Sequence, residues 1–181
     1  MARRLRLTHR ALWVVSAALV WPAASQAWPA RVQRVADGDT VWVQRLHTTE
    51  PPGKPQLVRL QGIDAPEGCQ AGGDAATQAL RARLLNEVVE LTPLGDDVHG
   101  RLLARVHLGG HDVGRDLVLQ GLAWSYRYKG DPGPYAAEEA AARQARRGLF
   151  AAGAPEPLPP RAFRQQHGRC VYQHGHPQQR P

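Results

Sequence analysis

The chain has 181 residues, of which 43% are hydrophobic and 22% are charged. This length suits a single domain, and the composition excludes a chain that is disordered throughout. The formal net charge of +7 comes from the two ends, because residues 1–27 and 157–181 each carry four arginines and no acidic residue. The part between them has 15 basic and 16 acidic residues, so its charge alone does not predict a basic face.

The first 27 residues have the pattern of a secretory signal peptide. Four arginines precede an apolar run over residues 11–21, and small residues follow as far as Ala27. The run is shorter than the roughly 20 residues that span a membrane, which favours a cleaved signal over the alternative of an uncleaved anchor. We expect cleavage after Ala27, export to the periplasm or the medium, and no stable membrane association of the mature chain.

The two cysteines, Cys69 and Cys170, are far apart in the sequence. Their number excludes a disulfide scaffold and a four-cysteine zinc site. In an oxidising compartment they could form one disulfide, and the alternative is a pair of buried or free thiols.

The strands predicted by the hydrophobic pattern come mostly early in the chain. Alternating valines over residues 31–44 predict a hairpin that turns at residues 37–39, and a polar loop follows at residues 47–54. Further strands are predicted over residues 56–63, 88–91 and 102–108.

Three helices are predicted between and after these strands. Asp74 can cap a helix over residues 74–85, Asp112 can cap a second helix through residue 120, and an Ala-, Glu- and Arg-rich segment predicts a third over residues 135–147. About five strands and three helices indicate an α+β fold, and the helix between the third and fourth strands suits an OB-fold five-stranded β-barrel. We expect this domain over residues 28–154, followed by a proline-rich connector and a basic tail over residues 155–181.

Acidic residues and arginines gather near the ends of the predicted strands, in three clusters over residues 37–40, 59–67 and 97–101. Each cluster alone is typical of a surface turn. If the strands meet, however, the clusters bring several carboxylates beside two arginines. Carboxylate oxygens suit Ca²⁺ or Mg²⁺, and arginine forks bind phosphate oxygens. The residues in question are Asp39, Asp64, Glu67, Arg59 and Arg101.

The order and spacing of several motifs resemble the staphylococcal nuclease family. The resemblance covers about residues 30–150 and rests on the segments VADGDTVWV, VRLQGIDAPEG, DVHGRLLARVHL, VGRDLVLQGLAWSYRY and EEAAARQARRGLF. It implies an OB-fold barrel with three helices and Ca²⁺-dependent hydrolysis of phosphodiesters in DNA and RNA. It also implies cleavage of the 5′ P–O bond and 3′-phosphate ends. We further expect low sequence specificity and a preference for single strands.

Carried over position by position, the resemblance assigns the Ca²⁺ ligands to Asp39, Asp64 and the main-chain carbonyl of Ala65. Ala65 stands where the best-known members have threonine, and because the ligand there is the carbonyl, the loss of a hydroxyl should not remove it. The resemblance assigns to Glu67 the role of orienting or activating the attacking water.

The resemblance further implies that Arg59 and Arg101 bind the scissile phosphate. Tyr126 and Tyr128 fall near the tyrosines that pack against substrate in the family, where flat rings can stack on bases. Their alternative role is packing at the rim of the barrel. His99 replaces a tyrosine that often precedes the Gly-Arg pair of the family.

Two other classes of protein are open alternatives. One is a noncatalytic OB-fold module that binds nucleic acid by charge and stacking. The other is an exported metal-binding protein that uses histidines of the tail, although their spacing fits no closed zinc site and is typical of a polar tail. The residues that this second alternative would use are His167, His174, His176 and Cys170. Nothing in the sequence indicates more than a monomer.

Overall fold

The computed structural model describes residues 26–46, 53–153, 155, 157–173 and 176–178. The predicted signal peptide up to residue 25, and residues 47–52 of the predicted polar loop, lie outside the described residues. No helix in the described part of the chain has the length and apolarity needed to cross a lipid bilayer.

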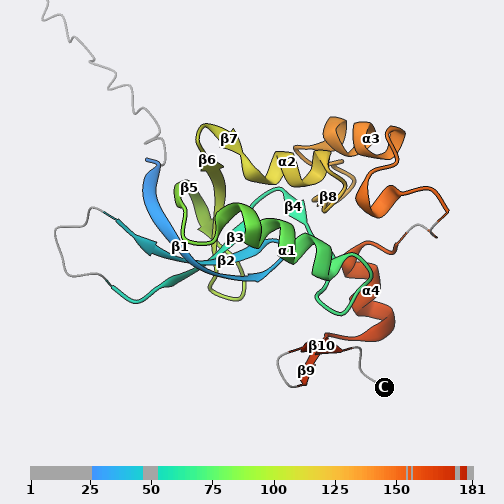
Figure 1. Cartoon of the computed structure of the whole chain (residues 1–181), viewed down its shortest axis with the longest axis horizontal. Coiled ribbons are helices and arrows are strands. Elements are labelled where there is room, and N and C mark those ends of the chain that lie inside the picture. Colours follow the sequence, from blue (N-terminus) through green and yellow to red (C-terminus); the bar gives the residue numbers. More distant parts are fainter. Residues whose placement is uncertain (1–25, 47–52, 154, 156, 174–175, 179–181) are drawn as a thin grey trace, which may run out of the picture.

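Five strands close into a barrel, which confirms the predicted α+β architecture (Figure 1). The strands follow the order β3-β2-β1-β5-β6, and a parallel pairing of β3 with β6 closes the ring. Their bounds are β1 (Trp28–Asp37), β2 (Thr40–Arg45), β3 (Gln56–Leu60), β5 (Val88–Asp96) and β6 (Leu102–Leu108). Three short strands accompany them, namely β4 (Ile63–Asp64), which pairs with β8 (Trp124–Ser125), and β7 (His111–Asp112), which pairs with β6.

The alternating sequence of β2 places one side of the strand in the barrel. Val41 and Val43 are fully buried, whereas Trp42 between them is half-buried and pairs with Arg34 of β1. The turn between β1 and β2 lies close to the rest of the fold, because a Cβ added at Gly38 would stand 2.8 Å from the Cβ atoms of Ala65 and Ala76. This turn therefore carries Asp39 directly against the segment that contains Ala65.

The predicted strand over residues 56–63 is broken in the structure. β3 ends at Leu60, and the chain turns through Gly62, whose φ of +86° lies in the left-handed region that favours glycine. The residues that follow form β4 and leave the barrel to pair with β8. β5 is longer than predicted, since it continues to Asp96 whereas the predicted strand ends at Leu91.

The three predicted helices are present, and a fourth follows them in the described part of the chain. α1 (Gly73–Leu84) packs on β1, and α2 (Val113–Leu119) packs on β6 and on α3 (Ala136–Gln144). Asp112 caps α2 as predicted, since its carboxylate accepts the backbone N–H of Arg115 at 3.0 Å. The predicted cap of α1 is wrong, because the cap position is Gly72 and Asp74 lies in the first turn.

The core fills the barrel and the face of α1 that lies against it. Aliphatic side chains dominate this core because every strand sends alternate residues inward. The largest fully buried aliphatic side chains are Val32, Val41, Val43, Val58, Leu60, Ile63, Leu80, Leu84, Leu91 and Leu117.

A buried carboxylate joins α3 to β8. Glu139 is 2% exposed. Its oxygens accept the backbone N–H of Ser125 at 3.0 Å, Nη2 of Arg127 at 2.6 Å and Nε of Arg143 at 2.9 Å. Glu139→Gln should lower the free energy of unfolding by about 2–3 kcal/mol, because it weakens several charged hydrogen bonds at once.

Urea unfolding of this variant beside Glu138→Gln tests the expectation. Glu138 pairs with Arg115, which is half exposed, so water screens the pair and the control should lose clearly less stability than Glu139→Gln. Equal losses in the two variants would contradict the structural role of Glu139.

The segment after the third helix forms ordered structure. A 3₁₀ helix, η1 (Gly148–Phe150), is followed by α4 (Pro160–His167) and by a hairpin of β9 (Val171–Gln173) and β10 (His176–Gln178). In Figure 1, α4 lies beyond the start of α1, at the end of the molecule away from the end of β2. The polar pattern of this segment predicts a tail and gives no indication of a helix, so α4 is a difference between the sequence prediction and the structure.

Candidate active site

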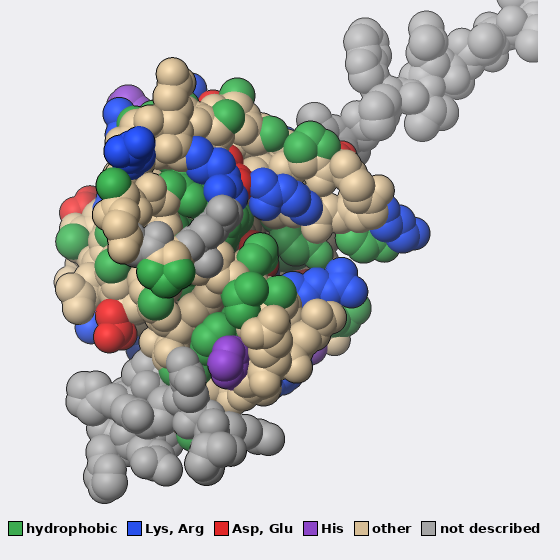
Figure 2. All heavy atoms as spheres, turned by 90° about the vertical axis from the view of Figure 1, so that its right-hand side faces the viewer, with side chains coloured by type: hydrophobic (Ala, Val, Ile, Leu, Met, Phe, Trp, Pro, Cys, Tyr) green, Lys and Arg blue, Asp and Glu red, His purple; other side chains and the backbone are tan. Residues whose placement is uncertain are grey.

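A pocket of about 710 Å³ opens where the β1–β2 turn, the β3–β4 segment and the β5–β6 loop meet. It brings together most of the residues predicted as a site, together with two arginines of the C-terminal segment. Figure 2 shows Lys and Arg side chains on the face that carries α3 and α4, with recessed hydrophobic and acidic side chains between them. The predicted site residues that line the pocket are Asp39, Arg59, Asp64, Ala65, Glu67, Arg101 and Tyr126.

Arg59 links the two carboxylates that are predicted as metal ligands. Its Nη1 donates to Asp39 Oδ1 and its Nη2 donates to Asp64 Oδ1 at 2.8 Å. Asp39 is 4% exposed and also accepts the hydroxyl of Thr40 at 2.9 Å and the backbone N–H of Ala65 at 3.0 Å. The arrangement follows from the strand register, because Thr40 of β2 stands opposite Arg59 of β3.

The acidic groups at this end of the barrel repel one another. Burial raises the pKa of Asp64 to about 6, and the neighbouring Asp39 carboxylate adds to the rise while Arg59 opposes it. Burial and the Asp39 carboxylate likewise raise the pKa of Asp37 to about 7. The pKa of Arg59 is also raised, because the attraction of Asp39 and Asp64 outweighs the effect of burial. The site therefore favours positive charge beside its carboxylates.

The donor set fits a hard divalent cation. Asp39, Asp64 and the Ala65 carbonyl offer oxygen atoms only, which suits Ca²⁺ or Mg²⁺ better than zinc. A cation here would offset the burial and the Asp39 charge that raise the pKa of Asp64. Within the described residues, no three or more His, Cys, Asp or Glu side chains are placed to hold a metal ion. Water and substrate oxygens would have to complete the coordination of such a cation.

The β5–β6 loop fixes Arg101 through Asp97. Nε and Nη2 of Arg101 both lie 2.7 Å from Asp97 Oδ2, while Asp97 Oδ1 accepts the backbone N–H groups of His99 at 2.8 Å and Arg101 at 3.0 Å. Burial opposes the ionised carboxylate, but these hydrogen bonds dominate and lower the pKa of Asp97. Arg101 is thus held at the pocket with further N–H donors available for a phosphate.

Glu67 lies on the loop between β4 and α1. Its backbone N–H donates to Oε1 of Gln70 at 3.1 Å, and its Oε1 accepts Nη1 of Arg164. The side chain of Glu67 is 24% exposed, so a carboxylate in the pocket retains access to water.

The two predicted tyrosines differ in position. Tyr126 lines the pocket, is 45% exposed, and donates its backbone N–H to the Gly62 carbonyl at 2.9 Å. Tyr128 is not among the pocket-lining residues and is 59% exposed, with Lys129 Nζ 5.2 Å from its ring centroid. The structure therefore brings Tyr126, but not Tyr128, to the candidate site.

The two cysteines form a disulfide, with 5.7 Å between their Cα atoms. Of the two alternatives that the sequence leaves open, the structure has the bridge, which joins Cys69 two residues after Glu67 to Cys170 after α4. Cys170 and Arg169 line the pocket.

Asp37, Asp97 and Arg164 are charged pocket residues to which the sequence prediction gave no role, although the first two lie in the predicted clusters over residues 37–40 and 97–101. The sequence could have indicated a role for Asp37, since it precedes Asp39 by two residues at the same turn. Asp97 lies four residues before Arg101, but in an exposed loop this spacing carries little information. Arg164 is distant in sequence from the predicted catalytic and metal-binding residues, and the pairing of Cys69 with Cys170 is a signal that indicates its position.

The fold and the pocket together define a class of protein, an OB-type barrel domain that presents carboxylates and arginines in one cleft. Comparison with known proteins specifies the family. Residues 57–152 match the family model described as staphylococcal nuclease homologue. The chain therefore belongs to the staphylococcal nuclease family.

Several bacterial relatives are similar over much of their length. The chain is 35% identical over 147 residues to an uncharacterized endonuclease of Escherichia coli O157:H7, which covers 80% of this chain and 90% of that protein. It is 36% identical over 134 residues to the micrococcal nuclease of Shigella flexneri, with 67% of this chain and 74% of that protein covered. An uncharacterized endonuclease of Haemophilus influenzae is 36% identical over 103 residues, which cover 56% of this chain and 55% of that protein.

Proposed function

We propose that this protein is an exported, Ca²⁺-dependent nuclease that hydrolyses phosphodiester bonds in DNA and RNA with low sequence specificity. Family membership and relatives named as nucleases support nuclease activity in general. The observation that carries the finer proposal is the meeting of Asp39, Asp64 and Glu67 with two arginines in one pocket.

The arginines supply the binding site for a phosphodiester. Arg59 and Arg101 line the same pocket, and a guanidinium can donate two parallel hydrogen bonds to phosphate oxygens. Both side chains are held by carboxylates, which reduces the conformational freedom that substrate binding would otherwise remove. Charge that grows on the phosphoryl oxygens in the transition state is stabilised by these donors.

Glu67 is the group that we assign to the attacking water. A carboxylate in the pocket can accept a hydrogen bond from water and take its proton as the oxygen attacks phosphorus. When bound by Asp39, Asp64 and the Ala65 carbonyl, Ca²⁺ would supply Lewis-acid polarisation of a phosphate oxygen. Breaking of the bond to the 5′ oxygen then leaves a 3′-phosphate end.

Tyr126 at the edge of the pocket supports a preference for single strands. Its half-exposed ring can stack on an unpaired base, and such stacking tolerates any base. A duplex hides the faces of its bases, so this contact is available chiefly to single-stranded DNA or RNA. We propose that the enzyme acts as a monomer.

Export is supported by the disulfide and by the N-terminal pattern. A disulfide persists in oxidising compartments such as the periplasm or the medium. Edman sequencing of the chain recovered from outside the cytoplasm should begin at Trp28, and recovery of the intact Met1 form alone would contradict cleavage of a signal.

Digestion of single-stranded DNA and of RNA by the purified mature chain tests the activity. We expect cleavage with Ca²⁺, none with a chelator, and 3′-phosphate ends on the mapped products. Binding of both substrates without cleavage in Ca²⁺ or Mg²⁺ would instead support the alternative, a noncatalytic nucleic-acid-binding module on the same barrel.

A further inference from the structure

The C-terminal segment (residues 157–171) is bound to the loop between β4 and α1, which carries Glu67. Contacts come from three residues of this loop and reach residues 158, 164 and 170 of the segment. They are the hydrogen bond from Gln70 Nε2 to the Leu158 carbonyl at 2.6 Å, the ion pair of Glu67 with Arg164, and the Cys69–Cys170 disulfide.

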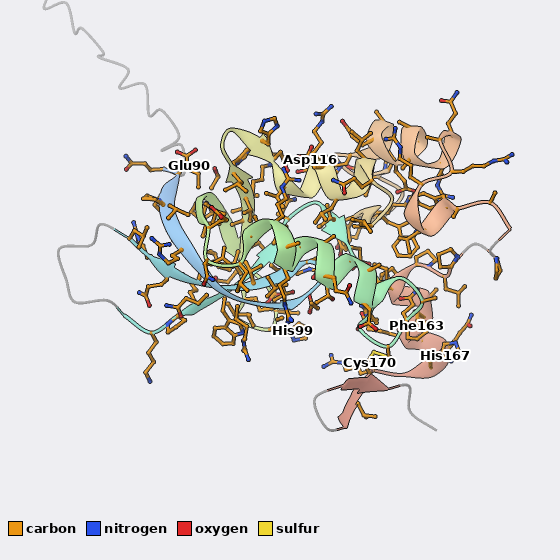
Figure 3. The ribbon with its side chains drawn as sticks, in the orientation of Figure 1. Glu90, His99, Asp116, Phe163, His167 and Cys170 are labelled. Atoms are coloured by element: carbon orange, nitrogen blue, oxygen red, sulfur yellow. A yellow bond between two sulfur atoms is a disulfide. The ribbon has the colours of Figure 1, made fainter. Side chains whose placement is uncertain are left out.

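Helix α4 lies between Leu158 and Cys170 in the chain, and a buried apolar side chain also holds it against the fold. Phe163 is 5% exposed, and its ring centroid lies 4.7 Å from that of His167 one turn later. Figure 3 shows Phe163 on α4 and the disulfide of Cys170 beside the end of that helix. The segment is therefore a fixed wall of the pocket.

Arg164 is the residue of α4 that reaches the active site. It lines the pocket and contacts Oε1 of Glu67, which leaves Oε2 of that carboxylate for another partner. The two side chains are 39% and 24% exposed, so water screens their attraction and the ion pair should add little to stability. Its effect is geometric, because a glutamate side chain has several rotamers and the contact selects one of them.

We propose that Arg164 is a positioning residue for the nuclease reaction, and that the Cys69–Cys170 disulfide holds it in place. The inference rests on the proposed function of Glu67. Arg164 orients the carboxylate that receives the attacking water, and the disulfide keeps α4 close enough for that contact. Reduction of the disulfide should therefore lower turnover as well as stability.

Steady-state kinetics on single-stranded DNA with Ca²⁺ test the role of Arg164. Arg164→Ala should lower kcat about tenfold or more, since small displacements of a reacting group have effects of this size, while KM stays within about twofold. Arg164→Lys keeps the charge and should recover part of kcat. Arg161→Ala removes an exposed arginine of the same helix that is not among the pocket residues, so its kcat should equal that of the wild type.

The thermal midpoint separates positioning from a general loss of structure. Arg164→Ala should have nearly the same midpoint as Arg161→Ala, because Arg161 is exposed and water screens the ion pair that Arg164 forms with Glu67. A rise in KM at unchanged kcat would overturn the proposal in favour of a substrate contact. A rise in kcat would also overturn it, since Arg164 would then block Glu67.

The disulfide is tested in a Cys69→Ser, Cys170→Ser double variant and by titration of the wild type with a reductant. Both should lower kcat as much as Arg164→Ala does, and adding Arg164→Ala to the cysteine-free chain should lower kcat no further. Fully additive losses would overturn the link between the disulfide and Arg164. If the cysteine-free chain does not fold, kcat and the far-UV circular dichroism of the wild type are followed together during reduction. A loss of kcat before the loss of helical signal supports the link, and a loss of kcat only together with that signal would overturn it.

The failure of this inference is distinguishable from the failure of the proposed function. A wild-type chain that cleaves neither DNA nor RNA with Ca²⁺ would overturn both. A wild-type chain that cleaves, together with an Arg164→Ala variant of undiminished kcat, would overturn the positioning role alone.

Discussion

Glu67→Gln should reduce kcat on single-stranded DNA about a thousandfold, within the range for removal of a general base. The amide has nearly the same size as the carboxylate and can still accept a hydrogen bond from Arg164 through its oxygen. It cannot take a proton from water at neutral pH. The variant should therefore keep the geometry of the pocket and lose the chemical step.

The measurement is single-turnover cleavage with Ca²⁺, together with binding of a short single-stranded oligonucleotide. The Kd of Glu67→Gln should stay within a few-fold of that of the wild type, because Arg59 and Arg101 are unchanged. Glu90→Gln is the matched control, since Glu90 is an exposed carboxylate on β5 that is not among the pocket residues (Figure 3). A Glu67→Gln variant that retains a tenth or more of wild-type kcat would contradict the role of Glu67.

Features set by short-range pattern could be predicted from the sequence. The β1–β2 hairpin follows from valines at alternate positions around an Asp-Gly turn, and the cap of α2 follows from an aspartate before an apolar run. The break after Leu60 was missed because the apolar pattern continues through Ile63. The tertiary structure accounts for the glycine at this turn, since Gly62 has a φ of +86° and a Cβ there would stand 2.7 Å from Pro134.

The candidate site was partly predictable for a similar reason. Asp39 lies beside Arg59 because the next residue, Thr40, pairs with Arg59 across the antiparallel strands β2 and β3. The sequence predicts both strands but not their pairing. Arg101 reaches the same pocket through the closure of the barrel, in which β3 pairs with β6 in parallel. That contact joins residues distant in sequence, so motif spacing alone could not predict it, and only the resemblance to a family placed Arg101 there.

Arg164 shows what a covalent restraint adds to such reasoning. The arginine lies in a polar segment without strand or helix periodicity, so pattern alone gives it no position. Cys69, however, follows Glu67 by two residues, and a bridge to Cys170 brings the end of α4 to the active site. Had the disulfide been taken as given, the sequence would have predicted that an arginine near Cys170 could reach Glu67.

Arg101→Ala should reduce kcat about a hundredfold or more, because it removes a preorganised donor from the developing charge of the phosphate. Stability should change little, since Arg101 lies in the β5–β6 loop and pairs only with its loop neighbour Asp97 among the contacts described. Arg101→Lys retains the charge but loses the planar fork, so it should recover only part of the loss. The comparison separates charge from geometry, because full activity in the lysine variant would mean that charge alone is needed.

Asp97→Asn extends this test to the group that orients Arg101. The amide oxygen can accept the backbone N–H groups of His99 and Arg101, yet the charged contact with the guanidinium is lost. We expect a kcat between those of the wild type and Arg101→Ala, and no further loss when Asp97→Asn is added to Arg101→Ala. Independent, multiplying losses would show that Asp97 acts on the reaction by a route other than Arg101, and would contradict the assignment of Asp97 as its support.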